Sequence, residues 1–115
     1  METKSIEKWF ESIEIIRTMV GTMPVQQISV FTYIALNPGC TSPDIEKALD
    51  MKQVAVGRSV RKLSDLVVKN RDGVRTKTGY ELIVNEPDPE DPRRHIFHLT
   101  KKGERIIGLV IDIFG

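Results

Sequence analysis

A proline-rich turn near the C-terminal end constrains the fold of this chain most. Residues 86–92 read EPDPEDP, and the three prolines remove backbone donors and clash with helical geometry, so no helix can run through them. The flanking segments, YELIVN at 80–85 and RHIFHLT at 94–100, have the β-branched and aromatic content and the alternation typical of strands. The sequence therefore predicts an antiparallel hairpin over residues 79–99.

Two helices are predicted at the start of the chain, at residues 3–20 and 24–36. In the first helix, apolar side chains recur every three or four positions, as on one helical face. Ile15 and Met19 fall on the opposite side of this helix. A helix with two apolar sides is usually buried on both. We therefore expect residues 1–20 to form a dimerisation helix that packs against a second copy of the chain.

Residues 41–68 carry the signals of a helix-turn-helix motif. The segment TSPDIEKAL offers Thr41 or Ser42 as an N-terminal cap, followed by a proline and an aspartate in the first turn. A break near Asp50 separates this helix from a second helical pattern at about 53–68. Two helices joined by a short turn, the second one basic, are typical of this motif.

The second helix of the pair has two different faces. Val54, Arg58 and Arg61 point away from its apolar stripe at about 100° per residue. Guanidinium groups bind guanine edges or phosphates, and an exposed apolar group suits a thymine methyl. This face therefore fits a reader of the DNA major groove. The predicted buried stripe comprises Val56, Val60, Leu63 and Val67.

Gly57 interrupts the same helix. A glycine inside a helix is about 1 kcal/mol less favourable than an alanine. It either allows close approach to DNA or to a neighbouring helix, or it only relieves crowding.

The last predicted helix, residues 100–115, is polar for one turn and then reads IIGLVIDIFG. A helix that is apolar on all sides is normally buried on all sides, and a small monomer does not easily cover it. The sequence therefore predicts a homodimer built from both chain ends. The expected dimer interface comprises Trp9, Ile15, Met19, Ile107, Val110, Ile111 and Phe114.

The net charge of +1 conceals segregated blocks. Residues 52–77 hold eight bases against two acids, whereas residues 81–91 hold five acids and no base. Residues 93–105 then bring five bases against one acid. Such segregation fits either a basic face directed at a polyanion or a solvated helix followed by charged loops.

Size and composition indicate one soluble domain over residues 1–115, because 40% of the residues are hydrophobic and 29% are charged. The sequence shows neither a membrane-spanning run nor a signal peptide, so we expect a cytoplasmic protein. The single cysteine, Cys40, is either a redox sensor or a small buried hydrophobe.

The sequence gives no reason to expect an enzyme. It holds no phosphate-binding glycine loop, no nucleophile with a plausible base, and no paired carboxylates outside the proline-rich turn. One cysteine and two histidines at strand spacing do not make a metal site. We therefore expect neither a metal nor another cofactor.

The order helix, helix, helix-turn-helix, hairpin, helix resembles the MarR family of winged-helix transcription regulators. The wing of that family reads Asp-x-Arg, four residues, then Leu-Thr-x-x-Gly. Here Asp91 and Arg93 are followed by RHIF, by His98 in an extra slot, and by Leu99, Thr100 and Gly103. The segment SPDIEKALDMKQVAVGRSVRKL matches the family's helix-turn-helix in length and core positions. The resemblance covers about residues 22–108 and implies a mainly α fold with a small β-hairpin wing (α+β).

The resemblance also implies a homodimeric transcription regulator that binds a roughly palindromic DNA duplex. The recognition helices would enter successive major grooves, and the wings would reach the minor groove or the backbone. Arg93 would be the wing arginine, with Asp91 as its ion-pair partner. The expected DNA-binding residues are Gln53, Val54, Gly57 and Arg58 near base edges, Thr41, Ser42, Lys52, Arg61 and Lys62 near phosphates, and Arg93 and Arg94 on the wing.

The chain departs from the family pattern in two places. The connector at about 69–78 is basic and is longer than the family's usual passage from recognition helix to wing. Some short phage-type relatives carry such an insert, which suggests a phage or prophage origin. The chain also stops where family members usually continue into another dimerisation helix.

Two other functions fit the same architecture. Winged helices also serve as protein-docking modules that do not bind DNA sequence-specifically. Such a module has no need for exposed Arg58 and Arg61 or a basic wing tip, and these features favour DNA. A role in replication or partition would use the same duplex-binding chemistry as regulation. The sequence does not indicate whether a small-molecule effector is involved.

Overall fold

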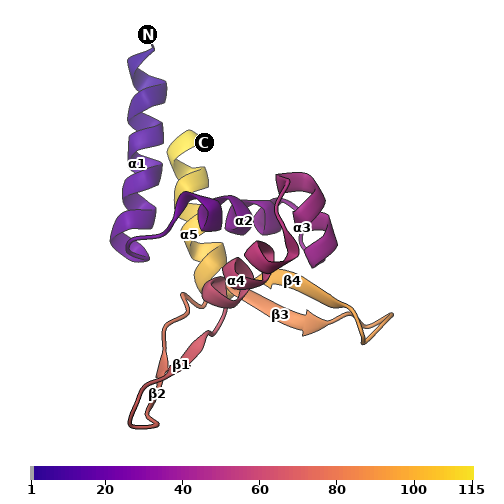
Figure 1. Ribbon diagram of the computed structural model, residues 1–115. Helices are drawn as coiled ribbons and strands as arrows, with labels where there is room; N and C mark the ends of the chain where they lie inside the picture. The colour runs from indigo at the N-terminus through magenta and orange to yellow at the C-terminus, as the bar shows by residue number, and fades with distance from the viewer. Residues whose placement is uncertain (1) are drawn as a thin grey trace.

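The computed structural model describes residues 2–115, which form five helices and two antiparallel hairpins (Figure 1). This confirms the predicted mainly α architecture with a helix-turn-helix and a wing. The elements are α1 (Thr3–Met19), α2 (Val25–Leu36), α3 (Ser42–Leu49), α4 (Gln53–Leu63), β1 (Val67–Lys69), β2 (Arg75–Lys77), β3 (Ile83–Pro87), β4 (His95–Leu99) and α5 (Lys101–Phe114).

The elements are arranged around the short helices in the middle of the chain. Helices α1 and α5 lie side by side and reach out at one end of the molecule, where both chain termini lie (Figure 1). The two hairpins, β1–β2 and β3–β4, leave the domain from the neighbourhood of α4 and diverge. The helix-turn-helix of α3 and α4 packs on α2.

Local signals determine where α3 begins. The hydroxyl of Thr41 accepts a hydrogen bond from the Asp44 amide at 3.4 Å, and the Asp44 carboxylate accepts one from the Thr41 amide at 2.9 Å. This reciprocal capping box satisfies two amides that a helix start otherwise leaves unpaired. Thr41, rather than Ser42, is therefore the cap. The helix ends at Asp50, whose left-handed φ of 51° closes the turn before α4.

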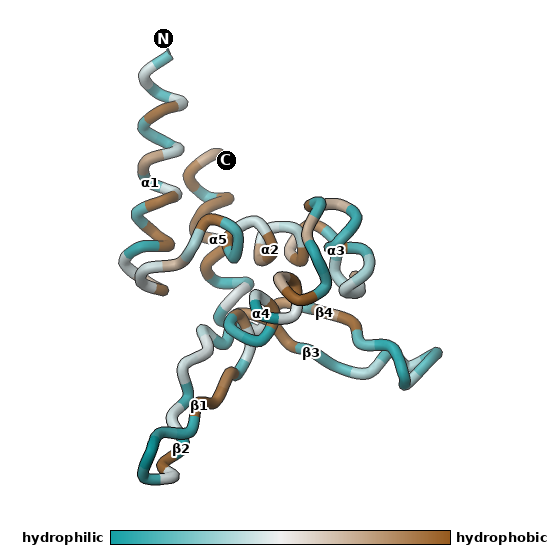
Figure 2. The backbone as a smooth tube through the Cα atoms, in the orientation of Figure 1, coloured by the Kyte–Doolittle hydropathy of each residue, from teal (hydrophilic) through white to brown (hydrophobic). Residues whose placement is uncertain are grey.

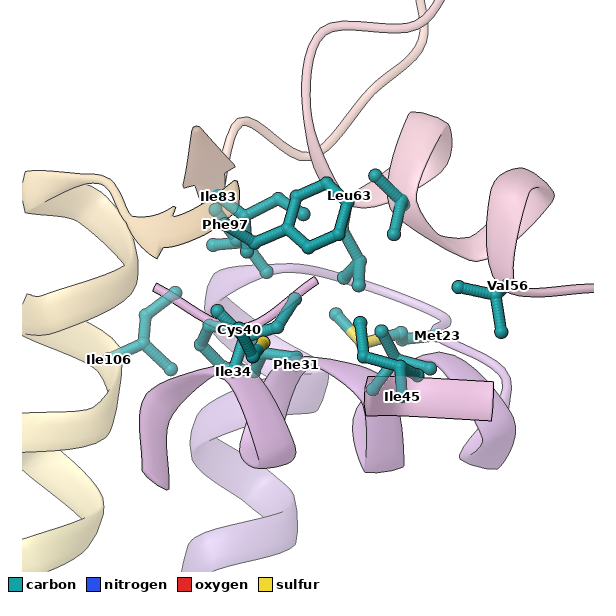
Figure 3. Packing of buried hydrophobic residues seen from close by; sticks show 13 residues of the cluster. Met23, Phe31, Ile34, Cys40, Ile45, Val56, Leu63, Ile83, Phe97 and Ile106 are labelled. Atoms are coloured by element: carbon teal, nitrogen blue, oxygen red, sulfur yellow. The ribbon is translucent and has the colours of Figure 1, made fainter. Parts of the chain in front are cut away.

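One hydrophobic core joins α2 to the helix-turn-helix, the wing and α5 (Figure 3). Phe31 and Ile34 of α2 are buried between Ile45 of α3, Phe97 of β4 and Ile106 of α5. Burying a side chain of this size contributes about 1.5–3 kcal/mol. The core therefore holds the helix-turn-helix at a defined orientation to the wing.

The structure corrects the predicted end of the recognition helix. Helix α4 ends at Leu63 rather than near residue 68, and Val67 is exposed in β1 instead of lying in the buried stripe. The amides of Tyr80 and Leu82 donate to the carbonyls of Lys62 and Leu63 at 2.9 and 2.8 Å. These bonds take the helix's last acceptors, so the chain turns away.

The predicted basic connector is a second hairpin. Strand β1 pairs antiparallel with β2, so that Val67 lies opposite Lys77 and Lys69 opposite Arg75. Its residues are exposed on both faces. This hairpin lies between α4 and the wing and was not predicted as a regular element.

The wing forms as predicted, with shifted strand ends. Strand β3 begins at Ile83 rather than at 80, and it includes Glu86 and Pro87, which were expected in the turn. A backbone bridge between Cys40 and Phe97 connects the wing to the turn before α3. The Phe97 amide donates to the Cys40 carbonyl at 2.9 Å, and the Gly39 amide donates to the Phe97 carbonyl at 2.8 Å. Across residues 2–115, no helix combines the length and apolar character that crossing a membrane requires.

Two glycines of α5 give a paired test of this packing. A Cβ on Gly103 would lie 2.3 Å from the Leu82 carbonyl oxygen, whereas a Cβ on Gly108 would meet no atom within 4 Å. We expect Gly103→Ala to lower the free energy of unfolding by about 1–3 kcal/mol through overpacking. Gly108→Ala should leave it unchanged or raise it by up to about 1 kcal/mol. Urea unfolding of both variants measures this, and equal stabilities would contradict the close approach of α5 to Leu82.

Candidate nucleic-acid interface

The outward face of α4 is the first part of the candidate interface. Val54 is 65% exposed although it is apolar, and Arg58 and Arg61 are exposed on the same helix. A Cβ on Gly57 would meet no protein atom within 4 Å. The glycine therefore relieves no crowding and allows no helix contact within the chain. These residues form an open surface with two guanidinium groups.

The first turn of α4 adds unpaired donors. Lys52 is the N-cap, and within residues 2–115 its first turn has no side-chain cap hydrogen bond. Helix N-termini with free amides carry partial positive charge and attract anions. Lys52 and Gln53 are exposed beside them. Thr41 and Ser42, at the start of α3, are half-buried, and the Thr41 hydroxyl is used in the capping box.

The wing carries the ion pair expected from the sequence and a second one that was missed. Arg93 Nε lies 3.3 Å from Asp91 Oδ1, and the Arg93 side chain is 92% exposed. Arg94 instead donates from Nη2 and Nε to Asp88 Oδ2 at 2.6 and 2.9 Å. Arg93 is therefore the extended arginine of the wing, and Arg94 braces its turn.

Asp88 organises the wing turn. Its carboxylate accepts the Glu90 amide at 2.9 Å, and its own amide donates to the Arg94 carbonyl at 2.7 Å. The Glu90 amide and the Arg94 guanidinium hold the pKa of Asp88 below its ordinary value. The wing turn therefore keeps its charge pairing at any pH above that ordinary value. The signal in the sequence for this second ion pair was an aspartate six residues before an arginine, across a proline-rich turn.

Lys62, expected near a phosphate, makes contacts within the chain. Its ammonium donates to the Thr78 carbonyl at 2.6 Å and lies 5.0 Å from the centroid of the Tyr80 ring. The side chain is partly buried between α4 and the following segment. In this structure Lys62 fastens the β1–β2 hairpin to α4.

The expected dimer residues divide into two groups. Trp9 is 65% exposed, and Met19, Ile111 and Phe114 are also exposed on α1 and α5. Ile15 and Ile107, by contrast, pack against the core of their own chain, and Val110 is half-buried. The described residues thus leave an apolar surface on α1 and α5 that includes the further side chains Ile6, Phe10, Ile13 and Leu109.

Cys40 lies inside the fold. It is 6% exposed, and burial raises the pKa of its thiol to about 11. Because the thiolate is the reactive form, a thiol kept neutral in this way is a poor redox sensor. Its backbone pairing with Phe97 places it under the wing.

We expect Cys40 to react slowly with iodoacetamide at pH 8. The thiolate fraction falls about tenfold for each pH unit by which a thiol pKa rises, so the shift from 9.0 to about 11 lowers the rate about 100-fold. Unfolding the chain in urea should restore the ordinary rate. Mass spectrometry over time measures both, and equal rates in folded and unfolded protein would contradict the burial.

Comparisons with known proteins agree with this geometry. No protein-family model matches the chain, and no curated protein sequence matches it significantly. Solved structures do match. The crystal structure of MarR aligns with a TM-score of 0.60 and 20% identity, over 99% of this chain and 76% of that one.

Two further structures extend the match. The complex of S. aureus MepR with DNA aligns with a TM-score of 0.67 and 24% identity, over 96% of this chain and 71% of MepR. The transcriptional regulator Tm0710 from Thermotoga maritima gives 0.67 and 22%, over 94% of this chain and 65% of that one. The chain therefore has the winged-helix fold of the MarR-family regulators.

Proposed function

We propose that this protein is a transcription regulator that binds double-stranded DNA in a sequence-specific manner. The observation that carries the proposal is the outward face of α4, where Val54, Arg58 and Arg61 lie exposed around the open backbone of Gly57. A folded helix that displays an apolar group and two guanidinium groups on one face suits base edges in a major groove. The matched fold includes a protein solved in complex with DNA, MepR.

The roles of the remaining residues follow from their positions. Arg58, Val54 and Gln53 lie on the first two turns of α4 and would meet base edges. Lys52 and the free amides of the first turn would bind a phosphate, as would Arg61 in the last turn of the helix. Arg93, held by Asp91, would enter the minor groove. Arg94 and Lys62 would act by shaping the protein surface.

We infer that the functional unit is a homodimer. Trp9, Phe10 and Phe114 are exposed on α1 and α5, on a surface too apolar for a solvated helix pair. A second copy of the same surface would cover it through a two-fold axis. Two recognition helices related in this way read an inverted repeat with half-sites about one helical turn apart. Such a regulator would act in the cytoplasm, where the DNA lies.

Selection from a random pool of DNA duplexes at about physiological salt tests this proposal. We expect an enriched inverted repeat, and the same selection with Arg58→Ala should give a motif degenerate at one or two positions. Loss of one bidentate base contact removes about 1–3 kcal/mol of discrimination. Retention of duplexes without a motif would contradict sequence reading. No retention at all would favour the protein-docking alternative.

Gly57→Ala separates stability from binding. Its Cβ would meet no protein atom within 4 Å, so we expect the substitution to raise the free energy of unfolding by up to about 1 kcal/mol. The added methyl group points into the space that DNA would occupy, so affinity for the selected duplex should fall. Gly108→Ala, also in a helix and equally open, is the control and should leave affinity unchanged. Unchanged binding by Gly57→Ala would contradict a close approach of α4 to the duplex.

A further inference from the structure

The β1–β2 hairpin concentrates the positive charge of the molecule. Residues 66–78 contain four bases and one acid, a net charge of +3, so the rest of a chain of net charge +1 carries −2. Lys69, Arg71 and Arg75 are exposed, and none of them forms an ion pair with an acid within residues 2–115. Lys77 pairs with Glu81 at 3.1 Å. Figure 2 shows the strongly hydrophilic tip of this hairpin far from the apolar core.

The hairpin is fixed to the end of the recognition helix. The Thr78 amide donates to the Leu66 carbonyl at 2.8 Å, and Lys62 of α4 donates to the Thr78 carbonyl at 2.6 Å. Gly79 lies so close to the backbone of Ser64 and Leu66 that a Cβ there would approach within 2.4 and 2.6 Å. The ends of both strands nearest α4 are therefore held against that helix, and the hairpin keeps its direction relative to α4.

The tip of the hairpin is also folded. The side-chain oxygen of Asn70 accepts the amides of Asp72 and Val74, both at 2.9 Å. The Asn70 amide donates to the Val74 carbonyl at 3.0 Å, and Gly73 supplies the positive φ of 80°. The bases around this turn are thus displayed on an ordered scaffold.

The wing does not provide a comparable charge. Residues 84–98 contain four acids and two arginines, a net charge of −2, and both arginines are paired with acids. Of the two arginines, Arg93 is the more exposed, although it is paired with Asp91. Phosphate binding depends on the number of cations that reach the backbone. The first hairpin is therefore the better candidate for this contribution.

We propose that the β1–β2 hairpin is a second DNA-binding arm, which contacts backbone phosphates at the edge of the major groove that α4 enters. The inference rests on the proposed function. Five residues in extended conformation span about 16 Å, which exceeds the major-groove width of about 12 Å. An arm of this length that starts at the C-terminal end of α4 is long enough to span the groove to the flanking backbone. Its lysines and arginines increase the affinity for DNA and lengthen the DNA segment that the protein covers, and α4 recognises the base sequence.

A charge-neutralised variant tests the proposal. The triple variant Lys69→Gln, Arg71→Gln, Arg75→Gln removes the three unpaired bases and leaves Lys77 with Glu81. Each lost phosphate contact reduces the slope of log affinity against log salt by about 0.9, so three per protomer, which are six in the homodimer, reduce it by about 5.4. The ratio of wild-type affinity to variant affinity should then be about 1,800-fold larger at about 50 mM salt than at about 200 mM. The selected motif should stay the same.

The matched control is the triple variant Lys4→Gln, Lys101→Gln, Arg105→Gln, which removes three exposed bases that hold no ion pair within residues 2–115. It changes the net charge by the same amount outside the hairpin, and size-exclusion chromatography checks that both variants keep the oligomeric state of the wild type. An unchanged slope in the hairpin variant, or an equal reduction in the control, would overturn the proposal while leaving the proposed function intact. Failure of the wild-type protein to bind any duplex would refute the proposed function and the arm together.

A tethered cleavage reagent gives a readout independent of charge. Asp72→Cys places a thiol at the exposed tip, and the buried Cys40 stays unlabelled in the folded protein. An iron chelate on residue 72 should cut the selected duplex at one position flanking each half-site. The same chelate on Thr3→Cys of α1 should give no such cuts. Absence of cuts from residue 72 on a duplex that stays bound would overturn the arm.

Discussion

The geometry of this molecule depends on how the last carbonyl groups of α4 are satisfied. A helix leaves its final carbonyls without partners inside the helix. Here the amides of Tyr80, Leu82 and Glu81 donate to the carbonyls of Lys62, Leu63 and Ser64 at 2.8–2.9 Å. This backbone clamp ends the recognition helix and fixes both hairpins to it, because the segment that supplies the amides lies between them.

The same segment extends the connection to α5. Leu82 is buried, its carbonyl accepts the Thr100 amide at 3.0 Å, and Gly103 packs directly against it. Thr100 also caps α5 through its hydroxyl. Leu82 therefore connects the start of α5 directly to the end of α4. In a homodimer formed through α1 and α5, this coupling would set the spacing between the two recognition helices.

The elements that local chemistry determines were predictable from the sequence. The capping signals at Thr41 and Asp44 mark α3, and the prolines of residues 86–92 require the wing turn. The β1–β2 hairpin was missed because Val60, Leu63 and Val67 continue a helical spacing, and long-range hydrogen bonds from residues 80–82 decide against it. The turn signal NRDG at residues 70–73, between β-branched residues, was the available clue.

The sequence predicts which residues make up the candidate site, but it predicts the role of each basic residue less well. Exposure of Val54, Arg58 and Arg61 follows from helical periodicity alone. Whether a base is free or engaged depends on distant acceptors. Lys62 binds the carbonyl of Thr78, and Arg94 binds the carboxylate of Asp88. No helical or strand period carries that information, so both were expected on DNA.

In the proposed function, α4 and the two hairpins form one DNA-binding surface, and α1 and α5 form the dimer surface. The most direct test is a titration of the ¹⁵N-labelled protein with a selected duplex, followed through its backbone amide signals by NMR. We predict that shifts concentrate in the first two turns of α4, in residues 69–77 and in residues 90–94, while Trp9 and its neighbours on α1 stay unchanged. Shifts confined to α1 and α5, with those of α4 unaffected, would contradict this account.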